Sequence, residues 1–157
     1  MRNRNSITLV LLAYAALLID ILVFKRVPVI RIGHRMLKVG GTHTGPPNFV
    51  PFRTILFYLH SGKGLVIVGL NLIGNIVVLI PVGFLAPFVF RGMDWRRAIL
   101  LAVASGLTIE GMQAIFQVGI FDVDDLILNG LGVMFGYCCF AIGHSAPVTR
   151  AHTSEPR

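Results

Sequence analysis

Long apolar runs, separated by more polar segments, dominate this chain. Four of the runs approach or exceed the length of about 20 residues that a helix needs to cross the hydrocarbon core of a bilayer. They cover residues 7–24, 65–90, 98–118 and 123–143. The pattern therefore predicts an all-α fold, a polytopic membrane helix bundle with four transmembrane helices. Pro81 lies inside the second run, where it predicts a kink.

The first run follows two arginines and has an apolar core, so a cleaved signal peptide is the alternative to a transmembrane helix. The residues after it read KRVPVIR and contain no small-x-small cleavage motif. We therefore expect the first run to be retained as a helix.

A long segment, about residues 25–63, separates the first two runs. It contains Gly40-Gly41 and Pro46-Pro47, which break regular structure. In its last part, NFVPFRTILFYLHSG, apolar residues recur every three or four positions, at Phe52, Ile55, Leu56 and Leu59. This stretch is too short to span a bilayer. It predicts a short amphipathic helix that lies on the membrane surface or caps the bundle.

Composition agrees with a membrane protein. The chain is 55% hydrophobic and 13% charged, with a mean hydropathy of +0.77, whereas a soluble domain carries about 25% charged residues. We expect one membrane domain over residues 1–143 and a polar, disordered tail over 144–157. The net charge of +7 indicates membrane lipid rather than nucleic acid as the partner.

Basic residues bear on the topology. With the N-terminus inside, seven of them fall on each side of the membrane, so the total count favours neither orientation. Short loops follow the positive-inside rule best, and the short loop 90–97 holds three arginines. We therefore expect both termini in the cytoplasm. The 25–63 segment and the aspartates near residue 124 then share the outer face.

Glu110 is the most unusual polar residue within the apolar runs. It is the thirteenth of 21 residues in its run, and Gln113 and Gln117 lie on the same helix face. A charged side chain at the membrane centre costs about 2.5–3.5 kcal/mol on insertion, which makes Glu110 a candidate functional residue. Hydrogen bonding between helices is the simpler interpretation for Gln117.

Two other runs also carry polar faces. Asn71 and Asn75 are four residues apart on the second run, and Asp125 and Asn129 are four apart on the fourth, where Gly132 continues the face. We expect these faces to point toward a common interior. A binding role and simple hydrogen bonding between helices both remain open for the asparagines.

Small residues mark the last run. Gly132 and Gly136 form a G-x-x-x-G pair, which predicts close helix packing. Cys138 and Cys139 are adjacent and match no zinc spacing. No cofactor is indicated.

Three aspartates, Asp122, Asp124 and Asp125, fall within four residues of FDVDDLILNGLG. Capping by Asp122 or Asp124, and the attraction of Asp125 to the helix dipole, account for one or two of them. Because like charges repel, the remaining aspartate needs a partner. Arg53 is the candidate counter-charge, and a divalent cation or a substrate contact are the alternatives.

Four stretches match the VanZ-like family in order and spacing, and the chain resembles this family over about residues 7–143. The stretches are NFVPFRTI (Asn48–Ile55), NLIGNIVVLIPVGFLAP (Asn71–Pro87), IEGMQ (Ile109–Gln113) and FDVDDLILNGLGVMFGY (Phe121–Tyr137). The chain departs from the family before the last stretch, where many relatives carry an arginine and this sequence reads QVGIFD. The polar and special residues inside the matching stretches are Asn48, Pro51, Phe52, Asn71, Asn75, Pro81, Gly83, Glu110, Gln113, Asp122, Asp124, Asp125, Asn129 and Gly132.

The resemblance implies a multi-pass protein of the bacterial cytoplasmic membrane, in a family named for a protein associated with teicoplanin resistance. The function it implies is altered susceptibility to glycopeptides or lipoglycopeptides, through binding of the antibiotic or of a lipid-linked cell-wall precursor. Two other functions remain open. One is a membrane-embedded enzyme for a lipid-linked or peptidic substrate, with Glu110 as general base and a metal ion on the aspartates. The other is a small proton-coupled carrier in which Glu110 titrates.

Overall fold

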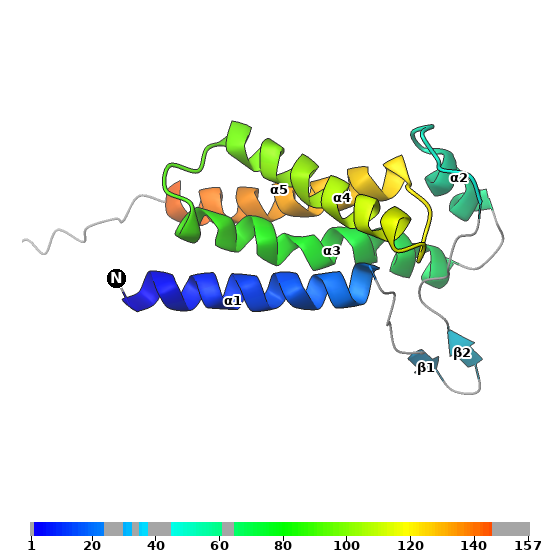
Figure 1. The fold of residues 1–157 in the computed structure, drawn as a ribbon, viewed down its shortest axis with the longest axis horizontal. Helices are drawn as coiled ribbons and strands as arrows, with labels where there is room; N and C mark the ends of the chain where they lie inside the picture. Colours follow the sequence, from blue (N-terminus) through cyan, green and yellow to red (C-terminus); the bar gives the residue numbers. More distant parts are fainter. Residues whose placement is uncertain (1, 24–29, 33–34, 38–44, 61–64, 146–157) are drawn as a thin grey trace, which may run out of the picture.

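The computed structural model describes residues 2–23, 30–32, 35–37, 45–60 and 65–145 (Figure 1). The first helix, α1 (Arg2–Leu18), continues as a π-helix over Ile19–Val23, and a short helix, α2 (Arg53–His60), follows much later in the chain. Three long helices complete the bundle: α3 (Leu65–Val89), α4 (Trp95–Ile115) and α5 (Val123–Ser145). The predicted tail lies outside the described residues, except for its first two positions, which end α5.

Among the described residues, four helices contain a stretch that is long and apolar enough to cross a membrane: Arg4–Ile21, Leu72–Val89, Trp95–Ile115 and Val123–His144. The prediction of an all-α membrane bundle with a short additional helix is therefore confirmed. The structure adds one small element that the sequence pattern did not predict. β1 (Ile30–Ile32) and β2 (Arg35–Leu37) form an antiparallel pair within the segment that was expected to be irregular.

The third span begins three residues earlier than predicted. Asp94 precedes α4 in an extended conformation, and its side chain accepts a hydrogen bond from the backbone N–H of Arg97 at 2.8 Å. This N-cap satisfies one of the amides that a helix start leaves without a partner. The helix then ends at Ile115, and Gln117 beyond it has a positive φ of 54°. The boundary is thus set by a polar cap that hydrophobicity alone does not reveal.

Helix α5 packs against both α3 and α4, and α1 packs along α3 (Figure 1). The buried core holds Leu18, Leu79, Ala102, Ile109 and Val133. The phenol of Tyr14 donates a 2.7 Å hydrogen bond to the carbonyl of Val78, which ties α1 to α3.

Glycines bring α3 and α5 into backbone contact. A methyl group on Gly132 would collide with the carbonyl of Ile76, and one on Gly136 would collide with the carbonyl of Ile80. From the other side, Gly83 of α3 lies against the carbonyl of Val133. The close packing predicted from the G-x-x-x-G pair is therefore confirmed.

The bundle has two distinct ends (Figure 1). One holds the start of α1 and the turn between α3 and α4, and the other holds α2 and the connection from α4 to α5. The amphipathic segment and the aspartates thus lie at the same end, as expected. The cytoplasmic location of the termini stays a prediction.

Candidate functional site

An extended stretch before α2 lies beside the start of α5. The N–H of Asn48 donates to the carbonyl of Phe121 at 2.8 Å, and the N–H of Val123 donates to the carbonyl of Asn48 at 3.0 Å. Asn48 and Asp122 thereby form a parallel bridge across 74 positions of sequence. This bridge fixes the chain that leads into α2 against the end of the bundle.

Asp122 caps its own helix and also binds the extended stretch. Its Oδ1 accepts the N–H of Asp124 at 2.9 Å, which is the N-cap interaction predicted for α5. The same oxygen accepts Nδ2 of Asn48 at 3.0 Å, and Oδ2 accepts the hydroxyl of Thr54 at 2.6 Å. A carboxylate that is 5% exposed is thus surrounded by donors. The capping prediction is confirmed for Asp122.

Asp124 caps a different helix from its own. Its side chain is fully buried and accepts the backbone N–H groups of Phe52, Thr54 (2.7 Å) and Ile55 (3.2 Å) at the start of α2. These amides carry the partial positive charge of a helix N-terminus, which favours an anion there. Phe52 has a positive φ of 67°, a strained backbone conformation for a bulky residue. The turn directs the N–H of Phe52 at the carboxylate.

The side chain of Asp125 contacts α3. Its Oδ1 accepts Nδ2 of Asn75 at 2.9 Å, and both residues are half-buried. Asn71 lies one turn earlier on α3, but its side chain is outside the part of the chain that the structure describes. The three aspartates therefore bind different sets of elements: Asp122 binds α5, α2 and the extended stretch, Asp124 binds α2, and Asp125 binds α3.

Glu110 lies at the same end of the bundle. It is fully buried, and its Oε2 accepts the backbone N–H of Asp122 at 3.0 Å. The expectation that Glu110 occupies the middle of its span is wrong, because α4 begins at Trp95 and Glu110 is the sixteenth of its 21 residues. Its carboxyl group consequently supports the connection into α5.

The remaining polar residues of the predicted interior face divide into two groups. Gln113 and Asn129 are buried, at 5% and 2% exposure, whereas Gln117 is exposed beyond the end of α4. Oδ1 of Asn129 is buried and accepts no hydrogen bond from the described residues. The common polar interior is thus formed by Asn75, Glu110, Gln113, Asp122, Asp124, Asp125 and Asn129.

Arg53 does not supply the expected counter-charge. It is the first residue of α2 and its side chain is exposed. Within the part of the chain that the structure describes, it forms no ion pair with the three aspartates. Backbone amides at the start of α2, together with Asn48, Thr54 and Asn75, replace it as the partners of the carboxylates.

The arrangement of the carboxylates does not fit a metal ion. The oxygens of Asp122 and Asp124 already accept bonds from N–H and O–H groups, which a cation would have to displace. Within the described ranges, no three His, Cys, Asp or Glu side chains are grouped so as to hold a metal. The carboxylates of Asp122 and Asp124 bind N–H and O–H donors of the chain itself.

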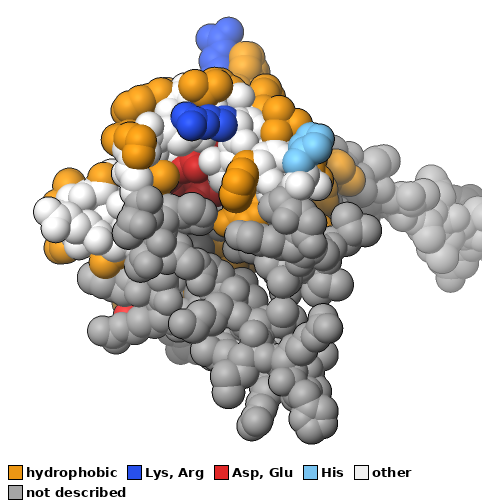
Figure 2. All heavy atoms as spheres, turned by 90° about the vertical axis from the view of Figure 1, so that its right-hand side faces the viewer, with side chains coloured by type: hydrophobic (Ala, Val, Ile, Leu, Met, Phe, Trp, Pro, Cys, Tyr) orange, Lys and Arg blue, Asp and Glu red, His pale blue; other side chains and the backbone are white. Residues whose placement is uncertain are grey.

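An outward apolar surface accompanies this cluster. We call residues 49–59 the apolar segment, because large side chains on it are more than half exposed: Phe49, Val50, Phe52, Leu56, Phe57 and Leu59. Figure 2 views this end of the molecule and shows hydrophobic side chains around a recess where acidic side chains are visible, with a basic side chain above it. The segment faces outward while its backbone is fixed to the bundle.

Sequence reasoning missed two residues of the cluster. Thr54 donates to Asp122, and Tyr58 is the buried residue on the inner side of α2. For Thr54 the available signal was its position in the first turn of the amphipathic helix. Tyr58 lies four residues later, which places it on the same helix face.

The pKa of Tyr58 is raised above its ordinary value of 10.0, first by burial and then by the negative charges of Asp125 and Asp122. A raised folded-state pKa means that the contribution of Tyr58 to stability is present below pH 10 and is lost as the pH rises through the raised value. We expect the ultraviolet titration of phenolate to lose one late-ionising group in Tyr58→Phe. Asp125→Asn should move its titration to lower pH. An unchanged titration in both variants would contradict this placement.

With this geometry established, comparison with known proteins identifies the family. The family model described as VanZ/LLP1 matches residues 11–144. The chain belongs to the VanZ/LLP1 family. It is 27% identical over 74 residues to Protein VanZ of Enterococcus faecium, a match that covers 47% of this chain and 46% of that protein. The match thus spans about half of each protein. No solved structure matches the chain.

Proposed function

We propose that this VanZ/LLP1 protein alters susceptibility to glycopeptide or lipoglycopeptide antibiotics by binding a lipid-linked component of the cell envelope. The observation that carries the proposal is the apolar segment, which buried carboxylates hold at one end of a transmembrane bundle. The support from relatives is the association of the family name with teicoplanin resistance.

The apolar segment suits the boundary between headgroups and acyl chains. Its exposed aromatic and aliphatic side chains, such as Phe49 and Phe57, would be unfavourable in water, whereas an amphipathic helix buries such a face about 5–10 Å into the lipid boundary. A lipid-linked precursor also places its lipid chain in the bilayer and its polar part at this boundary. The segment and the precursor would therefore meet at the same depth.

Fixed positioning favours binding there. The bonds from Phe52, Thr54 and Ile55 to Asp124 order the segment before any ligand arrives. A surface that is already ordered loses less conformational entropy on binding, which raises affinity. The half-buried polar groups of Asn75 and Asp125 lie at the same end and would face the polar part of the ligand.

The buried position of Glu110 favours this binding function over an enzyme or a carrier. A general base must reach the proton that it abstracts, yet Glu110 is fully buried and its carboxylate accepts the N–H of Asp122. A proton carrier would use a titrating group along the transport path, whereas Glu110 lies near the end of α4. Glu110 therefore acts as a positioning residue.

Expression of the wild-type protein in a susceptible bacterial host should raise the inhibitory concentration of teicoplanin. The double variant Phe49→Ser, Phe57→Ser should lose this increase, because it removes the lipid-contacting side chains without touching the buried carboxylates. Ile142→Ser is the control, since Ile142 is an equally exposed apolar residue on α5. Broth dilution measures the result, and immunoblotting checks that membrane levels are equal.

Two outcomes would contradict the proposal. If expression of the wild-type protein leaves teicoplanin susceptibility unchanged, the proposed function is wrong. Equal effects of the double variant and of Ile142→Ser would show that the apolar segment has no particular role.

A further inference from the structure

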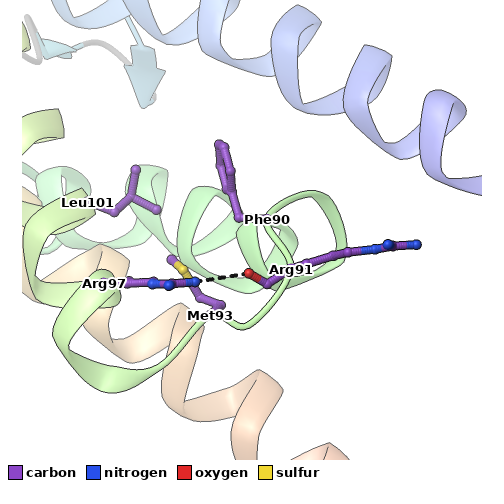
Figure 3. Close-up of a pocket in the computed structure, with 5 residues that line it drawn as sticks. All are labelled: Phe90, Arg91, Met93, Arg97 and Leu101. Carbon is purple, nitrogen blue, oxygen red and sulfur yellow. Dashed lines mark hydrogen bonds between the residues drawn. The ribbon is translucent and has the colours of Figure 1, made fainter.

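A pocket of about 330 Å³ lies at the opposite end of the bundle from the aspartates, at the turn between α3 and α4 (Figure 3). Its lining consists of three apolar and two basic residues: Phe90, Arg91, Met93, Arg97 and Leu101. Leu101 is six residues beyond the start of α4 at Trp95, which is about 9 Å along the helix axis. The lining therefore combines basic and apolar side chains at the turn, and Leu101 extends its apolar part toward the transmembrane part of the bundle.

Arg97 is held in place by the turn. Its Nη1 donates to the carbonyl of Arg91 at 3.0 Å and to the carbonyl of Gly92 at 2.8 Å. These carbonyls belong to the turn that follows the end of α3 at Val89. A guanidinium has five N–H donors, and in the described part of the chain only Nη1 donates. An ordered guanidinium thus offers its remaining donors to an anion.

The charge around the pocket is positive. Arg91, Arg96 and Arg97 outnumber Asp94, whose carboxylate accepts the N–H of Arg97 as the cap of α4. The guanidinium of Arg96 lies over the ring of Trp95, 5.4 Å from its centre. Tryptophan and arginine at the end of a transmembrane helix are typical of the boundary between bilayer and water. The pocket therefore lies where lipid headgroups are found.

We propose that this pocket binds the phosphodiester headgroup of an anionic membrane phospholipid. Arg97 is the principal phosphate ligand, because its planar guanidinium can bind phosphate through two parallel N–H groups. Figure 3 shows the side chain of Arg91 extending away from the other four residues, so Arg91 contributes its charge from the rim. Phe90, Met93 and Leu101 contact the glycerol backbone and the first carbons of the acyl chains. A free phosphate ion would leave this apolar wall unused.

The chain contains its own reporter for this site. Trp95 is the only tryptophan, it is 58% exposed, and it begins α4 beside the pocket. The purified full chain is placed in phosphatidylcholine nanodiscs that contain either brominated phosphatidylglycerol or brominated phosphatidylcholine as quencher. We expect phosphatidylglycerol to quench Trp95 at a mole fraction about fivefold lower, which corresponds to one basic contact with an anionic lipid.

Variants at three arginines, Arg91, Arg96 and Arg97, separate a specific site from diffuse charge. Arg97→Gln should lose the preference for phosphatidylglycerol, and Arg97→Lys should regain part of it. Arg91→Gln should weaken the preference, because Arg91 contributes its charge from the rim. Arg96→Gln removes the same charge from a residue outside the pocket lining and should keep the preference. Met93→Phe fills the pocket without a charge change and should also lose the preference. Met93→Phe and Arg91→Gln decide the matter if Arg97→Gln does not fold.

Three results would overturn the proposal. Equal quenching of the wild-type protein by the two lipids would show that the pocket does not select an anionic headgroup. Equal losses in Arg91→Gln, Arg96→Gln and Arg97→Gln would assign the effect to the net charge of the turn. Relief of quenching by millimolar inorganic phosphate would show that the site takes the free ion. Teicoplanin susceptibility is tested separately, because it depends on the other end of the bundle.

Discussion

Gly136→Ala is expected to destabilise the bundle more than the same substitution at Gly130 or Gly143 of α5. The new methyl group would collide with the carbonyl of Ile80, and the backbone N of Phe84 would be 2.8 Å away. Backbone atoms cannot rotate out of the way as a flexible side chain can, so α3 and α5 must separate. Overpacking of this kind typically costs about 1–3 kcal/mol and sometimes more. Thermal unfolding of the purified protein in detergent, followed by circular dichroism, measures the loss.

The same substitution elsewhere on α5 provides the control. Outside its own turn of helix, no described residue has an atom within 4 Å of the position that a methyl group on Gly143 would occupy. Alanine is a better helix former than glycine by about 1 kcal/mol, so Gly143→Ala should leave the unfolding midpoint unchanged or raise it. A Gly136→Ala variant as stable as Gly143→Ala would contradict the backbone contact between α3 and α5.

Asp124→Ala is expected to release α2 from the bundle and to abolish the proposed effect on teicoplanin susceptibility. The substitution removes the single acceptor for the backbone N–H groups of Phe52, Thr54 and Ile55. Leaving one buried donor without a partner costs about 1–3 kcal/mol, and here three amides are affected. The strained turn at Phe52 also loses the bond that holds it. Limited proteolysis should then cut within residues 48–60.

Asp94→Ala is the matched control for Asp124→Ala. Asp94 also accepts a backbone N–H at a helix start, but its site is exposed and it caps its own helix. Loss of such a cap costs about 1 kcal/mol, and it should neither expose α2 to protease nor change susceptibility. If Asp124→Ala and Asp94→Ala behave alike, Asp124 has no special role in holding α2.

The helices could be predicted from hydrophobicity because each span is one long apolar run with few polar residues in it. Their ends could not, as α4 shows. Its first turn contains Trp95, Arg96 and Arg97, which the apolar pattern assigned to a loop. The cap on Asp94 determines that boundary, and a single polar side chain contributes little to a hydrophobicity profile.

The site was predictable where its contacts are local. Asp122 caps its own helix two residues away, so the sequence indicated its role. Asp124 contacts amides about 70 positions earlier, and their direction depends on a positive φ at Phe52. Charge matching suggested Arg53 instead, because a sequence displays side-chain charges but not the partial charges of a helix N-terminus. The contacts of Asp124 could therefore not be predicted, because its partners are backbone amides.

Amide hydrogen exchange at the start of α2 tests most directly whether Asp124 holds the apolar segment on the bundle. In the wild-type protein, the amides of Thr54 and Ile55 should exchange slowly because each donates to a buried carboxylate. In Asp124→Ala they should exchange at least about tenfold faster, the factor that corresponds to 1.4 kcal/mol, while the amides of α4 remain protected. Equal exchange rates for Thr54 and Ile55 in the two proteins would contradict the account.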